Sequence, residues 1–164
     1  MVSIRRARAG DIAGITFVLA KTWRDTYSAF LPEASIAKIT SEWHSPEIIE
    51  AELDCPSTFA GVATVASGIV GMITAHSRGE LLHIARLYVL PAFQRRGIGE
   101  RLMEESYRAF PGTRRVQLEV EEQNPKARKF YGKLGFREVD VKSEDVAGTQ
   151  LNSIVMEKQI PDAA

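Results

Sequence analysis

The alternation of apolar and polar positions near the start of the chain predicts a strand followed by a long helix. Residues 2–7 alternate with a period of two, which is typical of a half-buried strand. Gly10-Asp11 then opens a helix whose apolar residues keep helical spacing, and Leu31-Pro32 marks its end. One or two shorter helices are expected over residues 33–53, divided near Ser45-Pro46.

The rest of the chain predicts strands interrupted by two helices. Residues 58–65 and 69–75 form a predicted hairpin, and further strands are expected at 82–90, 115–121, 136–141 and 151–157. Helices are expected at 98–110 and 124–134, and the second has Asn124 at its N-cap and Gly135 just past its end. This order predicts a single α/β domain over residues 1–164, with a mixed sheet too irregular for strict βαβ winding.

The parity of apolar residues within segment 82–90 predicts a β-bulge. Leu82 and Ile84 share one parity, whereas Leu87 and Val89 share the opposite one. A strict alternation cannot place both pairs on one face, but one extra residue near Ala85-Arg86 would do so. The alternative is a central strand that is apolar on both faces, in which parity carries no information.

Composition and charge exclude several classes of protein. Basic and acidic residues number 21 each, so no global field favours nucleic acid or an anionic membrane, and any anion site must be local. The first residues lack the apolar core of a signal peptide, and no stretch approaches a membrane span, so a cytoplasmic protein is expected. Cys55 is the only cysteine and is interpreted as a small hydrophobe rather than an acyl relay. The three histidines show no ligand spacing, so no metal site is expected.

The run from Gln94 to Gly99 carries the clearest chemistry, because it places two arginines and two glycines where a helix begins. A helix start exposes unpaired N–H groups and the positive end of the helix dipole. Glycine lets a phosphate approach the backbone, and arginine adds forked, charged donors. We interpret the loop as a pyrophosphate cradle. A site for ATP or NAD fits less well, because the loop lacks the Lys-Ser/Thr of a P-loop and the third glycine of a Rossmann turn.

Two motifs resemble those of the GNAT superfamily of acetyl-CoA-dependent N-acetyltransferases. The run LYVLPAFQRRGIG from Leu87 to Gly99 resembles motif A, and Glu119-Val120 followed by NPKARKFYGKLGF from Asn124 resembles motif B. Residues 82–139, about a third of the chain, carry the resemblance. It implies a twisted, mostly antiparallel sheet of about seven strands flanked by about four helices. The fourth and fifth strands would splay apart, with acetyl-pantetheine lying in the gap.

The resemblance also implies acetyl-CoA as the acetyl donor and assigns its contacts. Main-chain groups of Leu87, Tyr88 and Val89 would hold the pantetheine arm and the thioester. The side chain of Asn124 would reach the cofactor, and Tyr131 would lie against it. The pyrophosphate loop with its flanks would comprise Gln94, Arg95, Arg96, Gly97, Ile98, Gly99 and Glu100.

Acetyl transfer to an amine requires loss of an amine proton, polarisation of the thioester and protonation of the leaving thiolate. Direct attack in a ternary complex would need no covalent enzyme intermediate. Tyr131 holds the family's position for the acid, although it also falls near an apolar stripe. For the base, Glu119 matches a catalytic Glu of ribosomal-protein N-terminal acetyltransferases, and His83 matches a Glu of histone-type members. The alternatives are a solvated strand face for Glu119 and a structural role for His83.

The acceptor amine is left open by the sequence. A peptide N-terminus, a polyamine, an amino-acid derivative and an aminoglycoside-like drug are all compatible with the motifs. Trp23, Tyr27 and Phe30 either line the acceptor pocket or extend the core. Dimers are common in the family, so a homodimer is one option. The alternative function is a non-catalytic acyl-CoA-binding sensor or interaction domain, which would keep the cradle and lose the acid and base.

Overall fold

The computed structural model describes residues 1–29, 31–146 and 148–161. Its helices are α1 (Ile12–Tyr27), α2 (Glu33–Trp43), α3 (Pro46–Leu53), α4 (Ile98–Ala109) and α5 (Pro125–Lys133), with single 3₁₀ turns η1 (Ala9–Asp11) and η2 (Pro91–Phe93). Its strands are β1 (Ser3–Arg6), β2 (Thr58–Val65), β3 (Gly68–Arg78), β4 (Leu81–Val89), β5 (Arg115–Glu121), β6 (Arg137–Val146) and β7 (Thr149–Gln159). The predicted order of elements is confirmed. Residues 33–53 form two helices, and the hairpin of β6 and β7 is longer than predicted.

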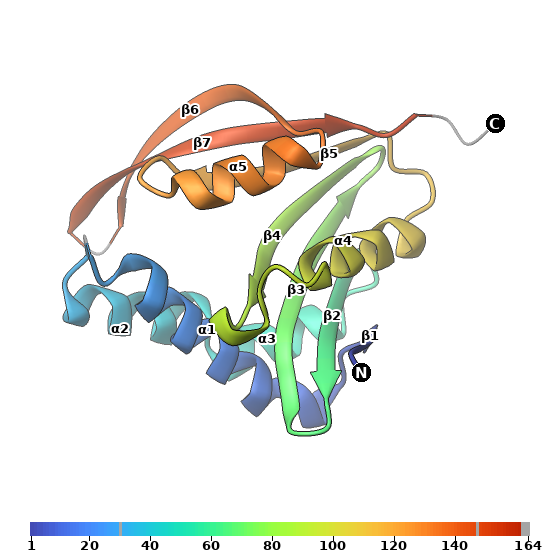
Figure 1. Ribbon diagram of the computed structural model, residues 1–164, viewed down its shortest axis with the longest axis horizontal. Coiled ribbons are helices and arrows are strands. Elements are labelled where there is room, and N and C mark those ends of the chain that lie inside the picture. The colour runs from blue at the N-terminus through green and yellow to red at the C-terminus, as the bar shows by residue number, and fades with distance from the viewer. Residues whose placement is uncertain (30, 147, 162–164) are drawn as a thin grey trace.

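The described strands form one seven-stranded sheet in the order β1-β2-β3-β4-β5-β7-β6. Neighbouring strands are antiparallel except β4 and β5, which run parallel and pair only over Leu81–Ile84 and Arg115–Leu118. Beyond these residues the two strands diverge, as Figure 1 shows. The predicted mixed sheet with a splay between the fourth and fifth strands is therefore confirmed.

The predicted bulge lies at Ala85. Thr74 and Ala75 are consecutive on β3 but pair with Arg86 and Ile84, so Ala85 is left over. The extra residue brings the apolar side chains on either side of the bulge to the same core cluster. These side chains are Leu82, Ile84, Leu87 and Val89.

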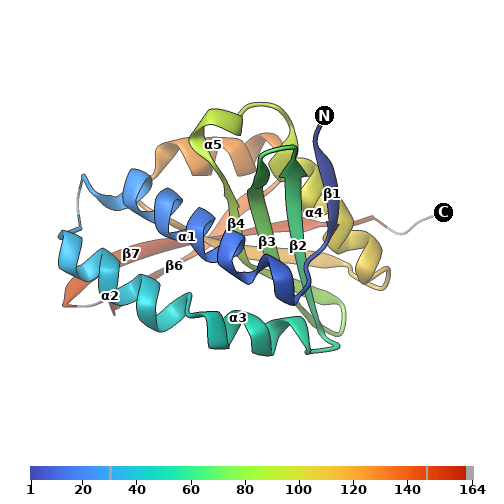
Figure 2. The ribbon, with the colours of Figure 1, turned by 90° about the horizontal axis from the view of Figure 1, so that it is seen from below.

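Helices cover both faces of the sheet (Figure 2). On one face, α1 buries Ile15, Val18 and Leu19 in a cluster with side chains of β2 and β3. On the other face, α4 buries Ile98 and Leu102, whose spacing of four residues places them on one stripe of the helix. Burying one such side chain stabilises a fold by about 1.5–3 kcal/mol, so the helical spacing read from the sequence fixes how each helix docks.

A third apolar cluster joins the N-terminal helices to the C-terminal hairpin. It contains Trp23, Leu31, Ile36, Ile39 and Leu151, and Tyr27 and Tyr88 pack against its edge. Leu151 lies near the start of β7, at the end of the hairpin that approaches α1 and α2 in Figure 1. The cluster therefore ties α1 and α2 to the half of the sheet that lies beyond the divergence of β4 and β5.

Candidate functional site

The loop between β4 and α4 presents backbone N–H groups that have no partner in the described part of the chain. Arg95 and Gly97 have left-handed φ values of 65° and 75°. The first helical bond is donated by Arg101 N to Gly97 O at 3.1 Å. Within the described residues no acceptor is found for the N–H groups of residues 95–100. Consecutive free N–H groups at a helix N-terminus form an anion site, so the local geometry agrees with the predicted cradle.

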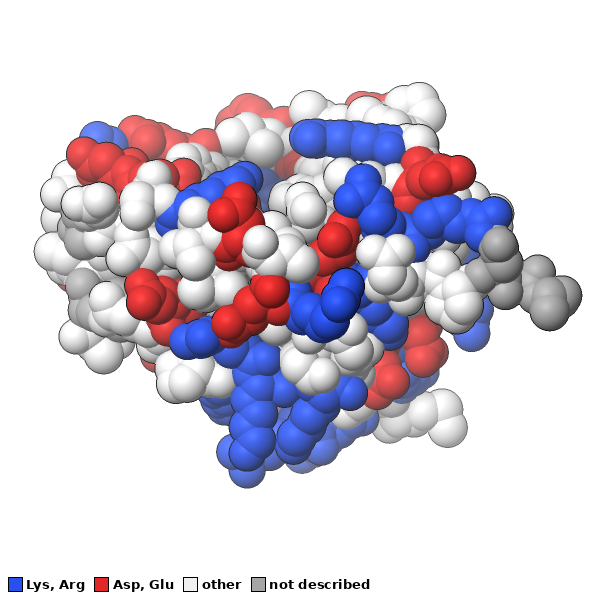
Figure 3. Space-filling view, turned by 90° about the horizontal axis from the view of Figure 1, so that it is seen from above, with Lys and Arg blue, Asp and Glu red and all other residues white. Residues whose placement is uncertain are grey.

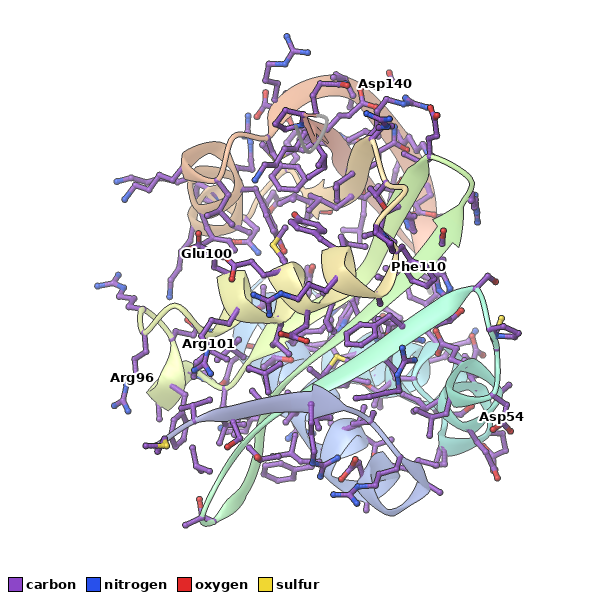
Figure 4. The ribbon with its side chains drawn as sticks, turned by 90° about the vertical axis from the view of Figure 1, so that its right-hand side faces the viewer. Asp54, Arg96, Glu100, Arg101, Phe110 and Asp140 are labelled. Carbon is purple, nitrogen blue, oxygen red and sulfur yellow. The ribbon has the colours of Figure 1, made fainter. Side chains whose placement is uncertain are left out.

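Gln94 fixes the start of this loop. Its Nε2 donates to Val89 O at 2.9 Å, and its Oε1 accepts from Lys126 Nζ at 3.0 Å. A glutamine amide can do both because it carries a donor and an acceptor. The side chain therefore connects β4, the loop and the first turn of α5. Arg96 lies with its guanidinium 5.3 Å from the centre of the Phe93 ring, and Figure 4 shows it at the outside of the loop.

The backbone of β4 beyond the bulge faces away from β3 at alternate residues. Leu90 N donates to Val70 O at 2.8 Å, so the antiparallel alternation directs the N–H and C=O groups of Leu87 and Val89 away from β3. Those of Tyr88 point toward β3. Because the ladder to β5 ends at Ile84, the groups of Leu87 have no strand partner among the described residues. They are available to an extended ligand such as a pantetheine arm.

The helix α5 begins at the predicted cap and carries Tyr131. The Asn124 Oδ1 accepts from Ala127 N at 3.2 Å, which confirms the N-cap. Tyr131 is half-buried and makes edge contacts with Phe130 and Phe136, at ring-centre distances of 5.0 and 5.6 Å. Burial raises the pKa of Tyr131 above its ordinary value, so the phenol stays protonated throughout the physiological range.

Phe130 brings α5 close to the first turn of α4. A Cβ added at Gly99 would lie 3.3 Å from Phe130 Cζ, which is tighter than ordinary van der Waals contact. Glycine at this position therefore allows the aromatic ring to sit beside the free N–H groups of the loop. Phe130 is 38% exposed.

Basic side chains gather around the loop and α5 although the formal net charge of the chain is zero. Arg95, Arg96, Lys126 and Lys129 are all exposed. Figure 3, seen from above, shows Lys and Arg collected along its lower edge, the side on which α5 lies in front of the sheet in Figure 1. Local positive charge thus accompanies the free amides, as an anion site requires.

The two candidate bases, Glu119 and His83, lie near each other. His83 is opposite Gln117 in the parallel ladder, and Glu119 is the first residue of β5 beyond that ladder. Glu119 Oε1 lies 3.0 Å from Lys142 Nζ of β6. Burial lowers the pKa of His83, and the negative charge of Glu119 offsets part of this shift. His83 is therefore neutral near pH 7 and able to accept a proton.

Trp23 and Tyr27 stack on each other at a ring-centre distance of 4.2 Å. Trp23 is 6% exposed and belongs to the third apolar cluster, whereas Tyr27 is half-buried at the edge of that cluster. Burial and the nearby groups Tyr88, Glu121 and Tyr131 all raise the pKa of the Tyr27 phenol. Tyr27 therefore lies within electrostatic range of groups from β4, β5 and α5. Phe30 lies outside the described residues.

A buried network around Arg86 was not predicted from the sequence. Arg86 Nη1 donates to both carboxylate oxygens of Glu52 at 2.7 and 2.8 Å, and Arg86 Nε donates to His44 Nδ1 at 3.0 Å. Burial and the charge of Arg86 lower the pKa of His44 to about 3. Because Nδ1 accepts, the neutral ring carries its proton on Nε2, which is buried and has no partner among the described residues. Arg86 follows the bulge directly, so the network holds α2 and α3 against it.

The described residues contain neither a metal-binding cluster nor a membrane-spanning helix. No group of three or more His, Cys, Asp or Glu side chains there is placed to hold a metal ion. No helix in the same part of the chain combines the length and apolar character needed to cross a membrane.

Comparison with known proteins identifies the family. The model of the acetyltransferase (GNAT) domain matches residues 28–159, so the chain belongs to the GNAT acetyltransferase family. The PaiA N-acetyltransferase from Thermoplasma acidophilum, solved in complex with coenzyme A, is similar with 25% identity and a TM-score of 0.84. That alignment covers 98% of this chain and 99% of the other. No curated protein matches the sequence.

Two more distant structures are similar in fold alone. The ribosomal-protein-S18-alanine N-acetyltransferase from Escherichia coli has 17% identity and a TM-score of 0.75, over 100% of this chain and 97% of that one. A GNAT-family acetyltransferase from Streptococcus pneumoniae has 20% identity and a TM-score of 0.69, over 98% of this chain and 100% of that one. The fold is therefore shared along essentially the whole length of these proteins.

Proposed function

We propose that the protein is an acetyl-CoA-dependent N-acetyltransferase that moves the acetyl group to a primary amine. One observation carries the proposal: the open end of the β4–β5 ladder lies next to a helix start whose N–H groups have no acceptor among the described residues. A strand-like pantetheine arm fits the first feature, and a diphosphate fits the second. Coenzyme A carries both groups in one molecule.

The donor would be held along its length by this chain's own groups. The N–H groups of residues 95–100 and the guanidinium groups of Arg95 and Arg96 would bind the diphosphate. The backbone of Leu87 and the N–H of Val89 would bind the pantetheine arm, since the C=O of Val89 already accepts from Gln94. The coenzyme A complex of the Thermoplasma acidophilum protein supports this choice of donor.

The chemical step would be direct attack of the neutral amine nitrogen on the thioester carbonyl carbon. The new C–N bond forms, the C–S bond breaks, and the acetylated amine and free coenzyme A leave. Tyr131 would donate a hydrogen bond and then a proton to the departing sulfur. Since its pKa is raised, the phenol stays protonated until negative charge develops on that sulfur.

The amine proton would pass to Glu119 or His83, directly or through water. Neutralising an alkylammonium of pKa about 10.4 at neutral pH costs on the order of 4–5 kcal/mol, so a nearby proton acceptor lowers the barrier. His83 is neutral, while Glu119 is paired with Lys142. Replacement of Glu119 by Gln and of His83 by Gln, one at a time, identifies the base as the variant with the larger loss of kcat.

The proposed function is tested by donor binding and by turnover. Acetyl-CoA should raise Tm, because it binds only the folded protein, and an amine should release free coenzyme A from it. Tyr131→Phe should lower kcat by about 100-fold or more while the Kd for coenzyme A changes little. Tyr107→Phe is the matched control, because it removes another hydroxyl, one on α4 that is buried and has no hydrogen-bond partner among the described residues. No rise in Tm at millimolar acetyl-CoA, or an equal kcat for both variants, would contradict the proposal.

A further inference from the structure

Glu121 is a buried carboxylate with an unused oxygen. It is the last residue of β5, lies opposite Ser153 of β7, and is 6% exposed. Its Oε1 accepts from Gln123 N at 3.2 Å, but its Oε2 is buried and finds no hydrogen-bond donor among the described residues. A buried carboxylate oxygen without a donor is costly, so a partner from outside the chain is the natural explanation.

No cation of the described chain neutralises this carboxylate. Glu121 forms no ion pair there, whereas Glu119, two residues earlier on the same face, is paired with Lys142. Its neighbour Glu122 adds negative charge, and this charge and burial both raise the pKa of Glu121. The electrostatic surroundings therefore favour a positively charged ligand at this end of β5.

Aromatic side chains lie within electrostatic range of this carboxylate. The charge of Glu121 acts on the phenol of Tyr27, and Tyr88 and Tyr131 act on the same phenol. Trp23 stacks on Tyr27 and extends the aromatic surface. A carboxylate with aromatic side chains in its neighbourhood can bind an ammonium group, through a charged hydrogen bond and cation–π attraction.

We propose that Glu121 anchors a second, non-reacting ammonium group of the acceptor, so that the acceptor is a diamine or a longer polyamine. The inference rests on the proposed acetyl transfer and names its acceptor class. A reacting amine must be neutral when it attacks, so a carboxylate suited to a cation binds a different nitrogen of the same molecule. Tyr27 lies within electrostatic range of both Glu121 and Tyr131. Glu121 also lies two residues from the candidate base Glu119 on the same face of β5, which places the anchor beside the proposed reaction site.

The test compares three acceptors of equal chain length: cadaverine with two amines, pentylamine with one, and δ-aminovalerate with an amine and a carboxylate. The amino acid is included because the buried Nε2–H of His44, which has no partner among the described residues, would suit a carboxylate. Each acceptor is assayed for kcat/KM with the wild type, Glu121→Gln and Glu122→Gln. The last variant is the matched control, since Glu122 is the exposed next residue. An unchanged Tm shift with coenzyme A checks that each variant is folded.

Glu121→Gln should lower kcat/KM for cadaverine by about 10- to 100-fold, the effect of a hydrogen bond to a charged group, and leave pentylamine within about twofold. Glu122→Gln should change neither acceptor by more than about twofold, because the charge of this exposed side chain is screened by solvent. The wild type should prefer cadaverine to δ-aminovalerate. Equal losses for cadaverine and pentylamine, or a wild-type preference for δ-aminovalerate, would overturn the anchor.

Calorimetry of cadaverine binding to the coenzyme A-saturated protein separates the two proposals, because it needs no turnover. Binding that depends on Glu121 without transfer to any amine supports the anchor and rejects the proposed function. Transfer that is independent of Glu121 supports the function and rejects the anchor.

Discussion

Arg86 donates two hydrogen bonds of 2.7 and 2.8 Å to the carboxylate of Glu52 and so joins α3 to β4 one residue after the bulge. The side chains are 9% and 15% exposed, which makes this a largely buried ion pair. Thr74 Oγ1 and Trp43 O accept further hydrogen bonds from the same guanidinium. The bulge at Ala85 is thus fixed by contacts from three neighbouring elements, and with it the direction in which the end of β4 leaves β5.

Removing one partner of this pair should be strongly destabilising. Arg86→Met leaves the Glu52 carboxylate buried and unpaired, so the free energy of unfolding should fall by about 3–5 kcal/mol. The double variant Arg86→Met with Glu52→Met should lose less, because no buried charge is left alone. Urea unfolding measures both. Arg24→Met is the control, since Arg24 meets Glu33 in an exposed pair at 3.5 Å and should cost less than about 1 kcal/mol. Similar losses for Arg86→Met and Arg24→Met would contradict the prediction.

His44 should make the fold sensitive to acid. Its folded-state pKa is about 3 against an ordinary value of 6.5, so below that ordinary value the unfolded chain binds the proton first. Stability from this group is fully present above about pH 6.5 and falls by about 1.4 kcal/mol per pH unit below it, until the folded pKa is reached. His44→Gln, which can still accept from Arg86, should lose less stability between about pH 7 and pH 5. If the free energy of unfolding of the wild type and of His44→Gln changed equally between about pH 7 and pH 5, the prediction would be wrong.

Arg95 and Arg96 should respond differently to glycine although they are adjacent and carry the same side chain. Arg95 has a φ of 65°, whereas Arg96 has no left-handed φ. Glycine at position 95 relieves a strained backbone. Glycine at position 96 relieves no strain and only increases the conformational entropy of the unfolded chain. Arg95→Gly should therefore be the more stable variant by about 1 kcal/mol in urea unfolding. Both should show a smaller Tm shift with coenzyme A, because each lacks a guanidinium. The reverse order of stability would argue against strain at Arg95.

Substitution should separate the role of the Asn124 side-chain oxygen from the role of its side-chain nitrogen. Asn124→Ala removes the cap on α5 and should cost about 1 kcal/mol. Asn124→Asp keeps an oxygen for Ala127 N and places a carboxylate at a helix start, where it is favourable, so stability should be retained. The aspartate lacks the Nδ2 donor proposed to reach the cofactor, and its affinity for coenzyme A should fall. If calorimetry finds equal affinity for coenzyme A in the wild type and Asn124→Asp, the proposed contact between Asn124 Nδ2 and the cofactor does not exist.

Features set by local spacing were predictable from the sequence. The change of parity between Ile84 and Leu87 located the bulge. One extra residue in a strand shifts the apolar positions that follow it from even to odd numbers, or the reverse, and this shift is visible in the sequence. The cap at Asn124 followed from the polar residue before Pro125. The splay between the fourth and fifth strands, however, was implied by the resemblance to a known family and not by periodicity.

Contacts between distant segments were not predictable. Arg86 meets His44 across 42 residues of sequence and Glu52 across 34, and no short-range pattern encodes such separations. Glu121 also looked unremarkable in sequence, because it belongs to a run of acidic residues of the kind that usually lies in solvent. Its burial depends on packing around the end of β5, which only the assembled sheet reveals.

The position of β7 affects how the protein is made. This strand follows β5 and β6 along the chain, yet it lies between them in the sheet. On the ribosome, one edge of β5 therefore keeps unpaired N–H and C=O groups until residues 149–159 have emerged. Exposed strands of other chains can pair with this edge during that interval. We expect nascent chains cut short before β7 to aggregate or to engage chaperones, whereas chains that include it close the sheet.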